Sequence, residues 1–400
     1  MPGPGPREAA VMSVDQGPLS SPQPSISSRQ AAIGALVLSA GRSTRQRGFK
    51  PLLPIGRRTV LEHCLHLFSK LETGPCQTVT VLGHRAEDLR PVVRGFGAIP
   101  VLNPDHDLGM FSSVQAGAAA LSPSVQAFFV LPVDIPLVRP LTISCLLQAM
   151  AENSIAQAFV PCFAGRTGHP PLLRSGLRQA IAAHDGSQGL RGVLAAARVE
   201  QVEVPDRHIL VDIDTPEQYR QALDLWQRRD IPSPDEAEAL LDRECGRSSQ
   251  VAAHSRAVAR VAGILARGVN SCQASQLDPD LAVAAALLHD IAKGSPDHCA
   301  AGARRLAELG FSTRLTGIVA GHADYDPDPH QAMNETEVVY LADKLVQGDA
   351  VIPLDERFQA KLSMFADNPE AVRAVQRRWE QARFIADRIA KACGGSLPSL

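Results

Sequence analysis

The pattern of hydrophobic and polar positions divides the chain into two parts. Up to about Leu225, short apolar runs alternate with stretches in which apolar residues recur at the helical period. This alternation predicts an α/β fold with a mostly parallel sheet. The expected strands are Gly34–Ser39, Thr78–Gly83, Ile99–Leu102, Ala127–Val133, Ala158–Pro161 and Val202–Val204. The helices expected between them include Val60–Leu71, Ser113–Leu121 and Leu141–Met150.

The segment Arg228–Asp235, RRDIPSPD, carries prolines and charges without an apolar period, which indicates a domain boundary. Beyond it the pattern is helical only, so the second part is expected to be all-α. Its helices are expected at Gln250–Arg267, Asp280–Lys293, Ala300–Leu309, Glu335–Val346 and Pro369–Cys393. We therefore divide the chain into a first domain at 31–227, a linker at 228–236 and a second domain at 237–400.

Composition narrows the functional classes. The 400 residues are 45% hydrophobic and 20% charged, which is typical of a globular protein with more than one domain. The net charge of -2 predicts no bulk attraction for nucleic acid or an anionic membrane. Residues 1–30 lack an apolar signal core and are expected to be a disordered tail. With no membrane-spanning run and no Cys-x-x-Cys pair among eight cysteines, we expect a cytoplasmic protein with reduced thiols.

The loop after the first expected strand is rich in glycine and cations. Arg42, Arg45, Arg47 and Lys50 follow Gly41 within nine positions. Backbone N–H groups in such a loop can bind phosphates while the side chains neutralise charge. A solvated basic turn between strand and helix is the alternative interpretation.

Two carboxylates follow other expected strands. Asp134 comes directly after the run ending at Val133, and Asp212 and Asp214 precede a helix that begins near Thr215. Ligands of open α/β sheets bind at the carboxyl ends of the strands, so we expect Asp134 and one or both later acids to hold Mg²⁺ facing a triphosphate. Helix capping is the alternative for each of them.

The motifs LSAGRSTRQRGFKPLLPIG, VTVLGHRAEDL, NPDHDLGMFSSVQAGAAAL, PVDIPL, GRTGHPPLL, DGSQGLRGVL and VDIDTPEQY occur in this order. Together they resemble the MobA-like nucleotidyltransferases, most closely the molybdenum cofactor cytidylyltransferase branch. The resemblance implies a Rossmann-like fold, Mg²⁺, an NTP (CTP favoured), a phosphorylated acceptor such as molybdopterin, and release of pyrophosphate. Molybdoenzymes or other molybdopterin-handling proteins are the partners it suggests; no nucleic acid or membrane partner is expected.

The resemblance also assigns roles to single residues. Catalytic roles fall to Arg45, Lys50 and Asp134, metal binding to Asp134 and Asp214, and acceptor binding to Gly168 and His169. The implied nucleotide-binding residues are Ser39, Ala40, Gly41, Arg42, Lys50, Gly83, Gly109, Ser112 and Ser113. The chain departs from the family in having Gln46-Arg47 where Met-Gly is usual, which bears on nucleotide preference.

In the second part, His289-Asp290 ends the apolar helical run LAVAAALLHDIAKG. Buried polar side chains need partners, and His254, His298, His322 and Asp343 are available in neighbouring expected helices and loops.

The set His254, His289, Asp290 and Asp343 resembles the H…HD…D pattern of the HD superfamily of metal-dependent phosphohydrolases. The resemblance implies a divalent transition metal such as Mn²⁺, Fe²⁺ or Ni²⁺. His298 and His322 lie where two-metal members carry further histidines. The number of bound ions, one or two, therefore stays open. The alternative is that both are ordinary surface histidines. Lys293 either contacts a substrate phosphate or complements a helix dipole.

The sequence therefore predicts a bifunctional enzyme, in which a nucleotidyltransferase is fused to an HD phosphohydrolase. The alternative is a sugar-phosphate nucleotidyltransferase whose HD domain has a regulatory role and senses a nucleotide.

Overall fold

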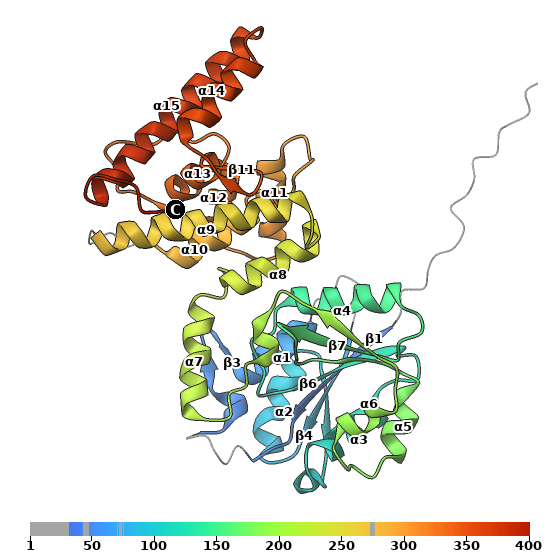
Figure 1. Cartoon of the computed structure of the whole chain (residues 1–400). Helices are drawn as coiled ribbons and strands as arrows, with labels where there is room; N and C mark the ends of the chain where they lie inside the picture. Colours follow the sequence, from blue (N-terminus) through green and yellow to red (C-terminus); the bar gives the residue numbers. More distant parts are fainter. Residues whose placement is uncertain (1–31, 43–47, 70, 72–73, 75, 273–276) are drawn as a thin grey trace, which may run out of the picture.

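The computed structural model describes residues 32–42, 48–69, 71, 74, 76–272 and 277–400. The expectations for the tail at 1–30 and for the loop residues Arg45, Gln46 and Arg47 lie outside these ranges. The chain forms an α/β body followed by a helical body, and the two meet near α4 (Pro140–Glu152) and α8 (Pro234–Cys245) (Figure 1).

The α/β body is built on one twisted sheet in which most neighbouring strands run parallel. The strand order is β10-β7-β9-β6-β1-β4-β5, with β8 paired to β7. Only β9 and the short β8 run antiparallel to their neighbours within this sheet. The strands are β1 (Ile33–Ser39), β4 (Cys76–Leu82), β5 (Ile99–Leu102), β6 (Ala127–Pro132), β7 (Ala158–Phe163), β8 (Arg166–Thr167), β9 (Leu172–Arg174) and β10 (Val199–Glu203).

Alternating side chains of the central strand β1 build the two layers that cover the sheet. Ala35 and Val37 pack in one apolar cluster, whereas Leu36 and Leu38 pack in another, because successive strand residues face opposite sides. The first cluster includes α1 (Val60–Phe68), α2 (Ala86–Gly95) and α4 (Pro140–Glu152). The second includes α3 (Met110–Ala120), α5 (Leu177–Ala183) and α6 (Leu190–Ala195).

The expected α/β class and all six expected strands are present, with ends that shift by up to three residues. The strand β9 was not predicted. It contributes three residues after Pro170-Pro171 and inserts antiparallel between β6 and β7. Three residues carry no readable period, so only pairing with its neighbours defines this strand.

The second body is helical, as predicted, and its core helix is α10 (Pro279–Leu288). Seven of the ten α10 residues are buried, and α10 packs against α8, α9, α12 and α13. Alanines such as Ala284 and Ala285 allow these helices to approach closely. The other helices are α8 (Pro234–Cys245), α9 (Gln250–Cys272), α11 (His298–Glu308), α12 (Thr313–Gly321), α13 (Glu335–Lys344), α14 (Leu354–Met364) and α15 (Pro369–Ala392).

A two-residue hairpin, β11 (Val346–Gln347) and β12 (Ala350–Val351), departs from the all-α expectation. Gly348 turns the chain there with a φ of 63°, a backbone conformation that glycine adopts without strain. Among the helices in the described ranges, none combines the length and apolar character that crossing a bilayer requires.

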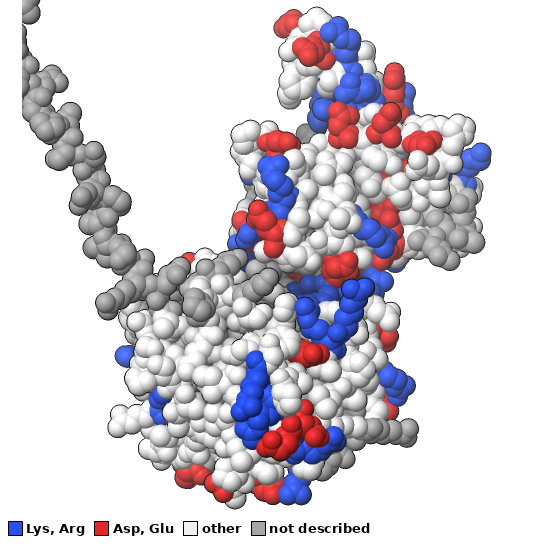
Figure 2. Space-filling view, turned by 180° about the vertical axis from the view of Figure 1, so that it is seen from behind, with Lys and Arg blue, Asp and Glu red and all other residues white. Residues whose placement is uncertain are grey.

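A buried polar network joins the two bodies. Asp206 accepts hydrogen bonds from the Arg139 backbone N–H and the Thr142 hydroxyl, both at 2.7 Å, and pairs with His208 at 2.8 Å. The Arg139 guanidinium in turn reaches Glu236 on α8 at 3.3 Å. Burial alone would raise the pKa of Asp206, but His208 and Arg139 lower it to about 2. Lys and Arg side chains also gather on the surface where the bodies meet (Figure 2).

We expect Asp206→Ala to lower the free energy of unfolding by about 3–5 kcal/mol, because it leaves buried partners of a charged network without their counter-charge. Chemical denaturation of the whole chain, followed by circular dichroism, measures this loss. The control variant is Glu87→Ala, because Glu87 forms an exposed ion pair with Arg90 on α2. An equal shift of the unfolding midpoint in Asp206→Ala and Glu87→Ala would contradict a structural role for the network.

Candidate functional site

The carboxyl ends of β1 and β6 bring two acids together. The two strands are paired in parallel with Leu38 opposite Pro132, and Asp134 is the second residue after β6. The Ile213 N–H donates to the Asp134 carbonyl at 3.0 Å, which places Asp214 beside Asp134. Neither acid caps a helix: α4 begins at Pro140, after the N-cap Arg139, and Thr215 caps α7 (Pro216–Gln227).

Lys50 lies between these acids. It begins the 3₁₀ helix η1 (Lys50–Leu52) and is only 8% exposed. Its Nζ is 2.6 Å from Asp214 Oδ1 and 3.5 Å from Asp134 Oδ2. Two carboxylates within reach of one cation are the oxygen donors that Mg²⁺ prefers, and this pair fits such an ion.

The remaining predicted residues of the glycine loop differ in their surroundings. Ser39 and Ala40 are buried at the end of β1, and a Cβ on Gly83 would lie 2.7 Å from the Ala40 carbonyl oxygen. Close packing is therefore sufficient to require glycine at position 83. Gly41 is exposed, and Arg42 forms an exposed ion pair with Asp107 at 2.6 Å.

The start of α3 lies beside the same sheet edge. Gly109 precedes the helix with a φ of 103°, and Asn103 donates to the hydroxyls of Ser112 and Ser113 at 2.9 and 3.0 Å. Asn103 was not among the predicted site residues. Its position directly after β5, at the same edge of the sheet as Asp134, is the signal that could have identified it.

Gly168 and His169 line a cavity of about 470 Å³ with mainly apolar walls. Leu38 and Phe111 contribute to these walls, and Arg191 contributes a cation. Gly168 allows a close approach, because a Cβ there would lie 2.4 Å from the Ile209 carbonyl oxygen. Burial lowers the pKa of His169, so its ring is neutral at pH 7. Sequence reasoning gave no role to Arg191 or Phe111, although both lie within motifs that carry the family resemblance, DGSQGLRGVL and NPDHDLGMFSSVQAGAAAL.

In the helical body, three of the predicted histidines share one arrangement. The Nδ1 atoms of His254, His289 and His322 lie 2.8, 2.7 and 2.7 Å from the carbonyl oxygens of Gly348, Ala286 and Val319. A histidine that donates Nδ1–H to a carbonyl presents Nε2 with its lone pair, which is the form that binds metals. Each Nε2 points toward a carboxylate of Asp290 or Asp343.

The carboxylates define two adjacent positions. Around the first, Asp343 Oδ1 lies 3.1 Å from His254 Nε2 and 3.9 Å from His289 Nε2, and Asp290 Oδ2 lies 3.5 Å from His289 Nε2. Around the second, Asp290 Oδ1 lies 3.3 Å from His298 Nε2 and 3.5 Å from His322 Nε2. Asp290 thus presents one oxygen to each position.

The chemistry of these side chains fits a metal. His289 Nε2 and Asp290 Oδ1 are buried and have no hydrogen-bond partner within the described ranges, an arrangement that bound ions would satisfy. Burial lowers the pKa of His289 to about 4, so its ring is neutral at pH 7. The pKa of Asp343 lies well below its ordinary value, because Lys344 and His254 outweigh the effect of burial. Neutral imidazoles and ionised carboxylates are the ligand forms.

Cations surround the cavity of about 670 Å³ that opens beside these ligands. Lys293 donates to Asp290 Oδ2 at 2.9 Å, and since α10 ends at Leu288, Lys293 does not lie in its last turn. Burial and the neighbouring Arg357 lower the pKa of Lys361 to about 8. The cations that line the cavity are Lys293, Lys344, Arg357, Lys361 and Arg378. Sequence reasoning identified only Lys293. Lys344 directly follows the predicted ligand Asp343 but was given no role, and the other cations lie on α14 and α15, which carry no motif.

Comparisons with known protein families match both bodies. A model of the MobA-like NTP transferase domain matches residues 35–203, and a model of the HD domain matches residues 251–347.

Individual relatives match the first body. The molybdenum cofactor cytidylyltransferase of Escherichia coli is 27% identical over 195 residues, which are 47% of this chain and 94% of the relative. The bifunctional protein GlmU of Cereibacter sphaeroides is 31% identical over 129 residues, which are 32% of this chain and only 28% of GlmU.

A solved structure also matches this body. The crystal structure of a homologue of Mycobacterium tuberculosis Rv0371c, from Mycobacterium sp. strain JC1, aligns with 49% of this chain and 98% of its own, at 26% identity and a TM-score of 0.44. The matches of the two family models, together with the sheet and the helical bundle described above, identify residues 35–203 as a MobA-like NTP transferase domain and residues 251–347 as an HD domain.

Proposed function

We propose that the first domain transfers a nucleotidyl group, CMP by preference, from an NTP to a phosphorylated acceptor, with molybdopterin as the favoured acceptor. The observation that carries this proposal is the group of Lys50, Asp134 and Asp214 at the carboxyl ends of the strands. Nucleotidyl transfer needs such a combination of carboxylates for Mg²⁺ and a cation for the phosphates.

In this proposal Asp134 and Asp214 would hold Mg²⁺, which neutralises phosphate charge when bound. A phosphate oxygen of the acceptor attacks the α-phosphorus in line, and the bond from the α-phosphorus to the bridging oxygen of the leaving pyrophosphate breaks. Lys50 offsets the charge that builds on this leaving group. Catalysis needs no covalent enzyme intermediate, so the residues act by orientation and charge.

The cavity around His169 favours a flat, partly apolar acceptor. Apolar side chains such as Phe111 and Val130 form most of its wall, and Arg191 could pair with a phosphate. A sugar phosphate, the alternative acceptor, would bring hydroxyl groups that need hydrogen-bond partners. A pterin would stack its ring on the apolar wall, so we favour it over a sugar.

Pyrophosphate release tests the transferase. The full chain is incubated with Mg²⁺, each of CTP, GTP and ATP, and either molybdopterin or a panel of sugar 1-phosphates. We expect release with CTP and molybdopterin that exceeds every sugar phosphate reaction. Release with a sugar phosphate and none with molybdopterin would reject the cofactor assignment while retaining nucleotidyl transfer.

We further propose that the HD domain hydrolyses a phosphoester of a nucleotide or related compound with Mn²⁺, Fe²⁺ or Ni²⁺ at the position between His254, His289 and Asp343. A bound metal supplies hydroxide at neutral pH, and the cations Lys293 and Lys361 would hold the phosphate. A regulatory domain that senses a nucleotide is the alternative. The orphaned Nε2 of His289, a ligand atom that a pure sensor has no need of, favours hydrolysis.

Phosphate release from nucleotide monoesters, and nucleotide release from diesters, test this activity after metal loading. We expect turnover of at least one class and its loss with a chelator. Tight nucleotide binding without turnover at any metal would favour the regulatory alternative. The cytoplasmic location, the boundaries of the linker and molybdopterin-handling partners stay predictions from the sequence.

A further inference from the structure

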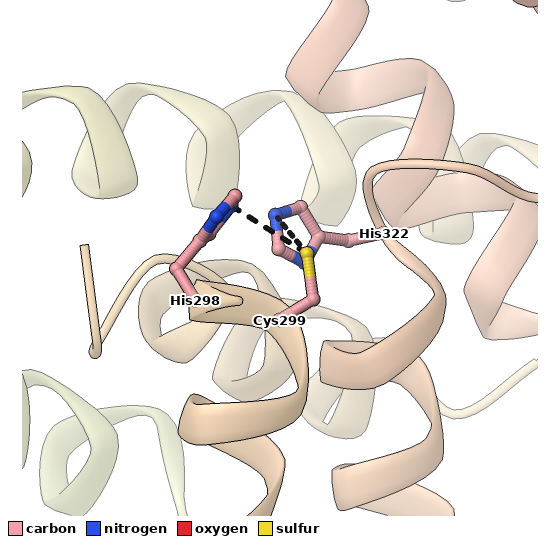
Figure 3. Close-up of side chains that lie close together, drawn as sticks. All are labelled: His298, Cys299 and His322. Carbon is pink, nitrogen blue, oxygen red and sulfur yellow. Dashed lines mark hydrogen bonds between the residues drawn. The ribbon is translucent and has the colours of Figure 1, made fainter. Parts of the chain in front are cut away.

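A cysteine lies beside the second of the two positions in the HD domain. Cys299 follows His298 in the first turn of α11, whose N-cap Asp297 accepts a hydrogen bond from the Ala300 N–H. This turn directs both side chains toward His322, which follows α12. The three side chains converge, and the sulfur interacts with both rings (Figure 3). Neither proposed activity has given Cys299 a role.

The distances from Cys299 to the two histidines match those between ligands of one tetrahedral ion. Bond lengths for a zinc-like metal give separations of about 3.6 Å between sulfur and nitrogen ligands and about 3.4 Å between nitrogen and oxygen ligands. Cys299 Sγ lies 3.5 Å from His298 Nε2 and 3.9 Å from His322 Nε2. Asp290 Oδ1 lies 3.3 and 3.5 Å from the same two nitrogens.

We propose that Cys299 is a thiolate ligand of a metal ion at this second position, together with Asp290, His298 and His322. This inference rests on the proposed metal-dependent function of the HD domain and extends it to a specific ligand. When the ion binds, a bond forms between Sγ and the metal, and the thiol proton is released to solvent.

A thiolate ligand changes the metal preference of the second position. Sulfur and imidazole ligands suit Zn²⁺ better than Mn²⁺ or Mg²⁺, which favour oxygen. Four protein ligands also close the coordination shell, as in structural zinc sites. The first position, with His254, His289, Asp290 Oδ2 and Asp343, has no sulfur ligand, and it lies beside the cation-lined cavity. We infer that the two ions have different roles: the ion at the second position holds Asp290 in place, and the ion at the first position binds the substrate.

Cobalt substitution tests the ligand directly. The full chain is stripped of metal and titrated with Co²⁺ alone, and near-ultraviolet absorption is recorded, where only a thiolate ligand gives a charge-transfer band. We expect the band in the wild type, its absence in Cys299→Ser and its persistence in Cys245→Ser. Cys245 is a suitable control because it is half-buried in the same domain, and its Sγ contacts the Ile291 carbonyl oxygen at 3.6 Å.

Zinc affinity provides a second measurement. Competition with a chromogenic chelator should show that Cys299→Ser binds Zn²⁺ at the second position at least about tenfold more weakly than the wild type. The Zn²⁺ affinity of the first position should be unchanged. Cys299→Ala is measured as well, because the serine oxygen introduced in Cys299→Ser can itself bind the metal in place of the thiolate. Circular dichroism checks that both variants are folded.

The outcomes separate the two proposals. If Co²⁺ binds without a charge-transfer band, or if Cys299→Ser keeps the band, Cys299 is not a ligand, although the HD metal site stands. If the full chain binds no Co²⁺ or Zn²⁺ in the HD domain, the proposed metal-dependent function fails as well.

Discussion

Lys50→Ala is expected to lower pyrophosphate release by at least about 100-fold, the size of effect seen when one charge-stabilising donor is removed from an active site. Lys50 is the buried cation closest to Asp134 and Asp214 among the described residues. Without it, no ammonium offsets the charge on the leaving pyrophosphate. Initial rates with CTP and the best acceptor, measured at saturating Mg²⁺, give the effect.

Two variants control this experiment. Arg90→Ala removes a cation from the exposed face of α2 and should leave the rate unchanged. The metal content of the HD domain should also be unchanged in Lys50→Ala, because its ligands lie in the other body. A rate within about threefold of the wild type would reject a catalytic Lys50. Loss of both transferase and hydrolase activity would instead indicate that the domains depend on each other to fold.

Asp290→Asn is expected to remove metal from both positions of the HD domain and to abolish its hydrolase activity. The reason is geometric, because Oδ2 lies beside His289 at the first position and Oδ1 lies beside His298 and His322 at the second. The amide keeps the size of the side chain but loses the negative charge that binds a cation. Elemental analysis of metal per chain, after dialysis against a weak chelator, measures the loss.

The matched variants distinguish a shared ligand from a general loss of structure. Asp280→Asn changes an exposed acid in the first turn of α10 and should retain wild-type metal content. His254→Ala should lose metal from the first position only, because His254 contacts Asp343 and not the second cluster. Equal metal content in Asp290→Asn and wild type would refute the bridging role.

Much of the fold could be predicted because its elements carry readable periods. The continuous apolar run of β1 and the almost wholly apolar sequence of α10 indicate buried elements, and Thr59 and Thr215 supply capping boxes. The three residues of β9 show no period, and its antiparallel pairing depends on neighbours far away in the chain. The hairpin at Gly348 was missed for the same reason.

The sequence likewise identified some of the candidate site residues and missed others. Asp134 and His289-Asp290 stand directly after apolar runs, so position alone identified them. Cys299 stands in a polar stretch, where a cysteine usually has no functional role, and Arg191 lies in the motif DGSQGLRGVL, whose individual residues were given no role. Their relevance arises only because α11 meets α12 and because α6 borders the His169 cavity.

The sequence by itself determined the order of helices and strands, the two domain classes and the identity of most candidate ligands, because periodicity and motif order are local properties of the chain. The tertiary structure decided that Lys50 lies between two acids, that Asp290 offers one oxygen to each position, and that Cys299 interacts with two histidines. These are distances between atoms on separate elements, and only the packing of those elements fixes them.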